Sequence, residues 1–242
     1  MSHPHIFLDE IMRQAQDSEI IRLSMWVREG KSLSSYQGSG KEVLITDKEE
    51  YGMLEWADQI LCATNATRTK INDRYRKMLG FGDTPQIGDK IIGLSNQWKF
   101  CSVDNDPVPL TNGSIGTITN CKRDYVKLPG YISFDSIPIL TTSMITEDNH
   151  NFTNIPIDYS SLLKGQSFLN DGQKGKARVN KVKGIPFDFA YAYCITVWKY
   201  QGSQNNKILL FEENHPRDQL EHQKFLYTGI TRAVDKIVII RK

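Results

Sequence analysis

The sequence predicts an α/β domain that is interrupted by a small antiparallel β-barrel, and three observations support that prediction. Helical and strand-like patterns alternate up to residue 84. Residues 85–184 instead contain short β-type runs separated by turn residues, and strands and helices alternate again after them. One domain formed by 1–84 and 185–242, with the barrel inserted between these segments, explains this order most simply. Three unrelated small domains are the alternative.

The first segment is predicted to contain three helices and a strand. Residues 18–28 place apolar side chains at helical spacing between a polar cap and a glycine. Thr46 and Glu49 form a capping-box pattern for a second helix. Residues 59–63 form a short apolar run typical of a buried strand. The helix that follows carries an apolar face of Ile71, Tyr75 and Met78.

The rest of the chain is predicted from shorter patterns. Asn112-Gly113 is a strong turn dipeptide, and residues 171–175 are expected to form a loop. Strands of the barrel are expected at 90–94, 114–118 and 131–134. In the last segment, strands are expected at 190–197, 207–211 and 236–240, with a helix at 218–227.

Bulk composition excludes several classes of protein. The chain has 30 basic and 28 acidic residues, and its net charge of +2 does not by itself indicate a nucleic-acid-binding protein. Its four cysteines are scattered without C-x-x-C spacing, so neither a metal site nor a disulfide framework is expected. There is no charged leader and no apolar run of about 18 residues, so an intracellular, cytoplasmic protein without a membrane partner is expected.

Basic residues are concentrated in two short stretches. Residues 68–77 hold five basic residues and one aspartate, and residues 164–183 hold six basic residues and one aspartate. With Tyr75, Trp98 and Phe100 nearby, such residues could combine phosphate contacts with base stacking, as in sequence-independent binding of single strands. A solvated helix face or a lysine-protected edge strand is the alternative for both stretches.

Two further segments imitate nucleotide-binding motifs. Residues 38–41 (Gly-Ser-Gly-Lys) lack the spacing of a phosphate-binding loop, and Glu42 stands where a magnesium-binding hydroxyl is needed, so an exposed turn is expected. Residues 6–10 (Ile-Phe-Leu-Asp-Glu) look like the end of a magnesium-binding strand. Only five residues precede them, too few for the phosphate loop that normally comes first.

Two C-terminal segments carry the strongest chemical signal. Residues 192–203 form a strand that ends in a polar turn with Gly202 at its tip, where backbone N–H groups and Thr196 can approach a phosphate or a ribose. Residues 226–233 (Leu-Tyr-Thr-Gly-Ile-Thr-Arg-Ala) contain Arg232, whose guanidinium is suited to neutralise charge that develops on a γ-phosphate. Taken alone, this second segment is equally compatible with an ordinary helix that has a surface arginine.

These two segments resemble motifs V and VI of superfamily 1 helicases of the RecD/Dda type, which have a UvrD-like C-terminal domain. The family patterns are approximately T-V-H-K-x-Q-G-S-E and Y-T-G-[IL]-T-R-A. Residues 8–14 (Leu-Asp-Glu-Ile-Met-Arg-Gln) are similar to motif IV of the family, and residues 62–68 with Asn72 resemble its next, DNA-gripping motif. The stretch from Pro85 to Gly113 is similar to the SH3-like barrel that the family inserts in its second motor domain.

The resemblance implies a second RecA-like motor domain with an inserted SH3-like barrel, in a DNA helicase that translocates on single-stranded DNA from 5′ to 3′. It implies catalytic arginine fingers at Arg13 and Arg232. The residues implied in ATP binding are Gln14, Gly202, Gln204 and Thr231. The residues implied in DNA binding are Thr64, Asn65, Thr67, Arg68, Asn72, Thr196, Lys199 and Gln201.

The resemblance also implies ATP with Mg²⁺ as cofactors and a further domain as partner. The family's phosphate loop and magnesium-binding Asp-Glu, its Walker motifs, would lie before Met1. A preceding or separate RecA-like domain is therefore expected to hold the Mg²⁺, and the chain by itself is expected to be inactive. Its pathway would be DNA replication, repair or recombination, in a bacterial or phage-type system.

Two other functions stay open at this point. The first is a non-enzymatic single-stranded DNA-binding module left from a helicase. The second is an accessory subunit of a nuclease or recombinase, for which the sequence shows no clustered carboxylates.

Three residues depart from the family pattern. Trp198 replaces a histidine, Tyr200 replaces the small residue before Gln-Gly, and Gln204 stands where a glutamate usually meets the ribose. Because glutamine still hydrogen-bonds a hydroxyl, a weakened nucleotide contact is expected at this position.

Overall fold

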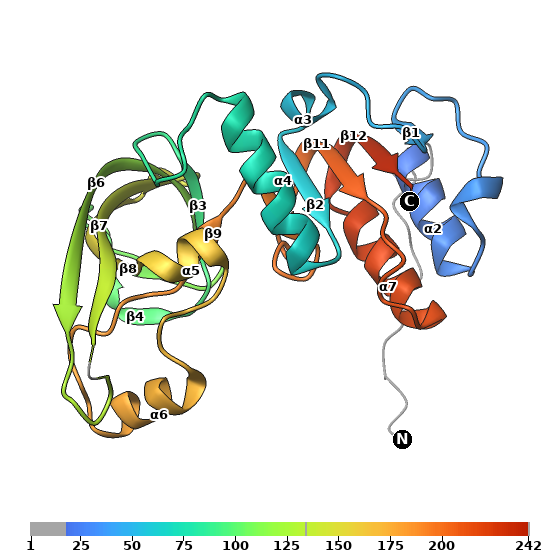
Figure 1. Cartoon of the computed structure of the whole chain (residues 1–242). Coiled ribbons are helices and arrows are strands. Elements are labelled where there is room, and N and C mark those ends of the chain that lie inside the picture. Colours follow the sequence, from blue (N-terminus) through green and yellow to red (C-terminus); the bar gives the residue numbers. More distant parts are fainter. Residues whose placement is uncertain (1–17, 134, 242) are drawn as a thin grey trace. The chain divides into compact units, whose positions relative to one another are not determined.

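The chain folds into two compact units. The computed structural model describes residues 18–133 and 135–241. The first unit combines the segment that ends at Thr64 with the segment that begins at Ile195, and the second unit is Asn65–Cys194 (Figure 1). Each unit has its own sheet and its own buried core, so each is described by itself.

The division between the units does not follow the predicted segment boundaries. The sequence predicts breaks after residues 84 and 184. Contacts instead group helix α4 (Asn65–Met78) and strand β9 (Phe189–Tyr191) with the antiparallel unit. The second unit is therefore larger than the predicted insertion.

A five-stranded sheet forms the centre of the first unit. Its strand order is β1-β12-β11-β2-β10, and the pairs β1/β12, β12/β11 and β11/β2 are parallel. The strands are β1 (Val43–Thr46), β2 (Gln59–Cys62), β10 (Cys194–Thr196), β11 (Asn205–Phe211) and β12 (Ala233–Ile240). Ile208, Leu209 and Leu210 in the central strand β11 are fully buried, as expected for a parallel strand that is covered on both faces. The predicted mixed α/β fold is confirmed.

Helices accompany this sheet in the first unit. They are α2 (Glu19–Arg28), η1 (Leu33–Ser35), α3 (Met53–Trp56) and α7 (Gln219–Ile230), and α2 packs against α7. The predicted apolar stripe of α2 is confirmed, since Ile20, Leu23, Ser24 and Val27 are buried. On α7, a Cβ atom at Gly229 would lie 3.0 Å from Leu210 Cδ2. Glycine at this position therefore lets α7 approach strand β11 closely.

The capping box predicted at Thr46 is wrong. Thr46 is the last residue of β1, where it pairs with Ile240 of β12. Its hydroxyl accepts a hydrogen bond from the backbone N–H of Lys48 at 3.2 Å, as in a turn. The helix in this region is only one turn long and begins at Met53, because pairing with β12 already uses the residues that the pattern assigned to a helix start.

An antiparallel sheet with the strand order β8-β7-β6-β3-β9 forms the second unit. Its strands are β3 (Lys90–Gly93), β6 (Ile115–Lys127), β7 (Ser136–Thr146), β8 (Asn151–Asp158) and β9, and a separate pair is formed by β4 (Gln97–Cys101) and β5 (Pro109–Leu110). The core of this sheet includes Ile91, Leu140, Phe152 and Ile155. The predicted turn at Gly113 is confirmed by a φ of +91°. The closed SH3-like barrel stays a prediction.

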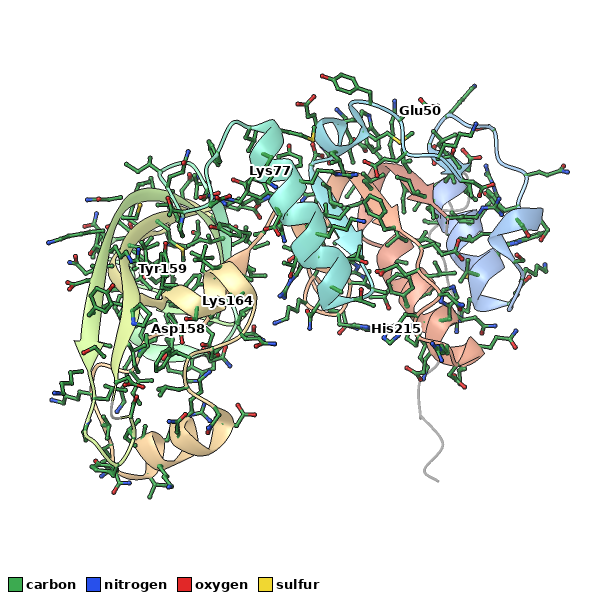
Figure 2. The ribbon with its side chains drawn as sticks, in the orientation of Figure 1. Glu50, Lys77, Asp158, Tyr159, Lys164 and His215 are labelled. Atoms are coloured by element: carbon green, nitrogen blue, oxygen red, sulfur yellow. The ribbon has the colours of Figure 1, made fainter. Side chains whose placement is uncertain are left out.

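Two short helices, α5 (Tyr159–Lys164) and α6 (Asp171–Val179), belong to this unit. Figure 2 labels Asp158 and Tyr159 at the start of α5 and Lys164 at its end. The buried carboxylate of Asp158 caps α5 by accepting from the N–H of Ser160 at 2.9 Å, and it also accepts from the N–H of Phe168 at 2.8 Å. This carboxylate therefore holds the connection between the two helices.

Three predictions for this region are wrong. The loop predicted at 171–175 is the first half of α6, which starts with a capping box between Asn170 and Gln173. The strand predicted at 131–134 is a turn as far as residue 133, because Ile132 N–H donates to Pro129 O at 2.8 Å; residue 134 lies outside the described part. The single strand predicted at 190–197 is two strands, β9 and β10, which lie in different sheets.

No helix in the described part of the chain is both long enough and apolar enough to cross a membrane.

Candidate functional site

The two C-terminal motifs meet at one edge of the parallel sheet. Strands β11 and β12 are parallel, and their first residues, Asn205 and Ala233, are paired. The residues that directly precede these strands, Gln204 and Arg232, must therefore lie side by side at the amino edge of the sheet. The register of the two strands thus brings together residues from two motifs that are separate in the sequence.

Arg232 joins these two motifs through its guanidinium group. Its Nε donates to Thr228 O at 2.9 Å, its Nη2 donates to Thr231 Oγ1 at 3.0 Å, and its Nη1 donates to Ser203 O at 3.2 Å. The backbone N–H of Asn205 in turn donates to Arg232 O at 3.0 Å. The side chain is half-buried, so part of the guanidinium faces solvent.

The remaining residues predicted to bind ATP lie in the same place, apart from Gln14. Exposed Gln204 donates from Nε2 to Thr231 O at 3.2 Å. Gly202 lies in the same turn with a φ of +96°, and apart from its chain neighbours no atom of residues 18–133 or 135–241 lies within 4 Å of the place a Cβ would take. Its backbone conformation, rather than crowding, therefore favours glycine. We call Ser203, Gln204, Thr231 and Arg232 the amino-edge cluster.

Arg13 and Gln14, the other residues predicted at the nucleotide, lie outside the described residues.

Two of the departures from the family pattern help to build this turn. Tyr200 is 2% exposed, and its hydroxyl accepts from Asn205 Nδ2 at 2.6 Å, so the bulky ring anchors the turn to the start of β11. Trp198 is 38% exposed and lies against Phe225 of α7, with 6.5 Å between the ring centroids.

At the carboxyl edge of the same sheet, Glu213 holds the residues that follow β2. Its Oε2 accepts from Ala63 N at 2.6 Å and from Thr64 N at 3.0 Å, and its Oε1 accepts from the Thr64 hydroxyl at 2.9 Å. We call Ala63, Thr64 and Glu213 the carboxyl-edge clamp. Glu213 was not among the predicted site residues, because its partner Thr64 lies 149 residues away in the sequence.

The predicted DNA-binding residues are divided between the units. Thr64, Thr196, Lys199 and Gln201 belong to the first unit, and Asn65, Thr67, Arg68 and Asn72 belong to the second. In the first unit Gln201 is exposed, whereas Thr196 is 5% exposed and its carbonyl accepts from Lys199 N at 2.9 Å. In the first turn of α4, Asn65 is exposed and Thr67 is half-buried.

Burial argues against direct DNA contact by Arg68 and Asn72, which are 5% and 3% exposed. The Asn72 amide accepts from Cys194 N at 2.8 Å and donates to Cys194 O at 2.9 Å, so it anchors α4 to the 191–194 segment. Arg76 of the same basic stretch forms a buried ion pair with Asp89 at 2.7 Å. The predicted basic surface at 68–77 is thus partly used by the fold.

The Gly-Ser-Gly-Lys segment is an exposed turn that surrounds a carboxylate of the protein itself. Glu19 accepts hydrogen bonds from Ser39 N, from Ser39 Oγ at 2.9 Å, from Glu42 N at 3.2 Å and from Val43 N at 3.3 Å. Burial raises the pKa of Glu19, but these hydrogen bonds lower it more, and the net pKa lies below the ordinary value. The backbone N–H groups of Ser39, Glu42 and Val43 are therefore already bonded to a carboxylate of the protein.

Among the described residues, no three His, Cys, Asp or Glu side chains are grouped so that they could hold a metal ion.

Comparisons with known proteins agree with the motif assignment. Residues 191–240 match the family described as UvrD-like helicase C-terminal domain, which confirms the resemblance of this part of the chain to superfamily 1 helicases. No curated protein matches the sequence of the chain.

Solved structures similar to this chain include Pif1 helicases. One is from Candida albicans (15% identity, TM-score 0.49, 96% of this chain and 55% of that one). Another is from Bacteroides in complex with ADP-AlF3 and single-stranded DNA (16% identity, TM-score 0.49, 95% and 50%). The chain thus spans about half the length of these two structures.

Proposed function

We propose that this chain is the C-terminal motor part of an ATP-dependent DNA helicase. The amino-edge cluster would face ATP and Mg²⁺ bound to a preceding or separate RecA-like domain that carries the Walker motifs. The observation that carries this proposal is the position of Arg232, which joins motifs V and VI at the edge of a parallel sheet. The match of residues 191–240 to a helicase C-terminal domain supports it.

The bonding of Arg232 leaves its positive charge available to a phosphate. All three of its acceptors are neutral carbonyl or hydroxyl oxygens, and no carboxylate of the described residues pairs with it. A guanidinium gains more from a phosphoryl oxygen than from a neutral acceptor, because charge-assisted hydrogen bonds are roughly twice as strong. Arg232 is thus held in place by weak partners that a γ-phosphate can replace.

The other members of the cluster would position the nucleotide. Gln204 is exposed and its amide donates a single hydrogen bond of 3.2 Å, to Thr231 O, within the described part of the chain, so it can turn to a ribose hydroxyl. Arg13 and Gln14 would approach the phosphates from motif IV, as the family resemblance implies.

The carboxyl edge of the sheet would contact single-stranded DNA. The carboxyl-edge clamp fixes the turn that carries Thr64, next to the exposed Asn65 at the start of α4. Lys199 and Gln201 of motif V, in the turn that follows β10 (Cys194–Thr196), would add further contacts. The 5′ to 3′ direction, and an SH3-like barrel in the antiparallel unit, are parts of this proposal that rest on the family resemblance.

DNA-stimulated ATP hydrolysis tests the proposal when the chain is fused behind the N-terminal motor domain of a superfamily 1 helicase. Arg232→Ala is expected to lower turnover by about 10³-fold or more, as for other arginine fingers. Arg232→Lys should restore little, because an ammonium lacks the planar fork. Arg241→Ala is the matched control, since Arg241 follows β12 at its other end and pairs with Asp47.

The result also separates the two candidate functions. Normal hydrolysis by Arg232→Ala would overturn the assignment of motif VI. A fusion that binds single-stranded DNA but never hydrolyses ATP would favour the non-enzymatic binding module.

A further inference from the structure

The far end of the β6–β7 hairpin and helix α6 form a lobe with its own small core. Leu128, Ile132, Ile137, Ile139, Leu169 and Ala177 form this core. Gln173 of α6 donates from Nε2 to Ile132 O at 2.8 Å, which ties the helix to the end of the hairpin. Figure 1 shows α6 beside the end of the hairpin where β6 is connected to β7. We call residues 122–139 and 168–185 the distal lobe.

The distal lobe carries cations that the fold does not neutralise. Residues 170–185 contain five basic residues and one acidic residue. Lys174 is already used, because it pairs with Asp188 and donates to Ser167 Oγ at 2.7 Å. The other four basic residues are exposed, and no acidic group in the described part of the chain pairs with any of them. They are Lys176, Arg178, Lys181 and Lys183.

Exposed tyrosines lie on the same lobe. Tyr125 near the end of β6 is 58% exposed, and Tyr131 in the turn is 56% exposed. Tyr131 directly precedes Ile132, whose carbonyl is bonded to α6, so it lies close to the helix that carries the cations. Solubility alone does not explain this surface, because soluble surfaces usually mix positive and negative charges and expose few aromatic rings.

We propose that the distal lobe binds single-stranded nucleic acid, with phosphates at the four cations and bases stacked on the two tyrosines. Cations combined with exposed aromatic rings suit unpaired strands, because the rings need bases whose faces are free. Duplex DNA offers only its phosphates to such a surface. The inference concerns the same ligand, single-stranded nucleic acid, as the proposed function, but it assigns binding to other residues than those of the parallel sheet.

The salt dependence of binding to an oligothymidine tests the proposed contacts between the four cations and phosphates. The variant K176Q/R178Q/K181N/K183Q removes four charges, and asparagine is chosen at Lys181 because its φ is +51°. A single strand releases about 0.7 counterions per phosphate contact, so the slope of log K against log salt should fall by about 3. K41Q/K48Q/K224Q/K236Q, which removes four exposed cations of the first unit, should keep the slope of the unaltered chain.

Tyrosine substitutions test the proposed stacking of bases on Tyr125 and Tyr131. Tyr125→Ala and Tyr131→Ala should each weaken binding about tenfold, whereas the phenylalanine variants, which retain the ring, should bind like the unaltered chain. Tyr51→Ala is the control, since Tyr51 is 99% exposed on the first unit. Equal losses in Tyr51→Ala and Tyr131→Ala would overturn the role of the lobe.

Photocrosslinking of the full chain to a 4-thiothymidine oligonucleotide locates the contact directly. Crosslinks within 122–139 and 168–185 are expected. Crosslinks confined to the first unit or α4 would overturn this inference and leave the proposed function intact. Tighter binding of a duplex than of a single strand would also overturn it, whereas the proposed function is decided separately by hydrolysis in the Arg232 variants.

Discussion

Replacing Glu213 by alanine should destabilise the first unit by about 3 kcal/mol. The carboxylate accepts three hydrogen bonds, from two backbone N–H groups and one hydroxyl. Hydrogen bonds to charged groups contribute about 1.5–3 kcal/mol each, but half-buried Thr64 can bond to water after the change. Ala63 is 6% exposed, so its N–H would stay unsatisfied and accounts for most of the loss.

Thermal unfolding measures this effect. For a chain of this size, 1 kcal/mol lowers the Tm by about 2–4 °C, so Glu213→Ala should lower it by about 6–12 °C. Glu213→Gln keeps an acceptor oxygen without its charge and should cost about 1 kcal/mol. Glu212→Ala is the matched control, because its partly exposed pair with His222, at 3.3 Å, is worth about 0–1 kcal/mol. Equal Tm values for Glu213→Ala and Glu212→Ala would refute the idea that this carboxylate holds the turn.

Three further predictions concern stability. The pKa of Glu19 is lowered in the folded state, so its stabilising contribution is complete above the unfolded pKa and is lost as the pH falls through the folded pKa. Glu19→Gln should therefore flatten the acid side of a curve of unfolding free energy against pH. An unchanged acid side would contradict this. Arg76→Ala should cost about 3–5 kcal/mol in urea unfolding, because it leaves Asp89 buried without its partner, whereas changing both residues to apolar ones should restore most of the loss. Gly229→Ala should cost about 1–3 kcal/mol, since the added methyl would press on Leu210; a neutral effect would mean that α7 can shift.

The resemblance to motifs V and VI assigned Gln204, Thr231 and Arg232 to one nucleotide site. In the structure each of them precedes a strand by one or two residues, but the predicted strands began later, at 207 and 236, and the register that brings these residues together was not predicted. The carboxyl-edge clamp was not predictable in this way. Glu213 and Thr64 are 149 residues apart, and nothing near either residue indicates the partner. Asn72 resembled a DNA contact for the same reason, because its partner Cys194 lies 122 residues away.

Capping patterns show why some helices were misplaced. Thr46 and Glu49 have the right spacing, but Thr46 is committed to strand pairing with β12, a long-range contact. Asn170 and Gln173 form a real capping box, yet Gly172 and Gly175 lower the helix propensity of the segment and favoured a loop. A cap therefore predicts a helix only where no tertiary partner competes for the same backbone.

The two edges of the parallel sheet should give separable mutant phenotypes. Strand β11 runs from Asn205 at the amino edge to Phe211 at the carboxyl edge, and six steps of about 3.3 Å separate these ends by about 20 Å. This distance is more than twice the Debye length of about 8 Å at physiological ionic strength, so charges at one edge act little on the other.

Arg232→Ala should therefore lower hydrolysis in the fused motor by about 10³-fold or more. Its affinity for single-stranded DNA should stay within about twofold, because the charge of Arg232 is screened over the distance to the carboxyl edge, where we propose that DNA binds. Thr64→Ala should weaken DNA binding and leave the nucleotide affinity measured without DNA unchanged. Anisotropy titrations with labelled DNA and with a labelled nucleotide measure both quantities for each variant. If Arg232→Ala lost DNA affinity as strongly as hydrolysis, then the amino edge would contact DNA, and the assignment of the two edges would have to be reversed.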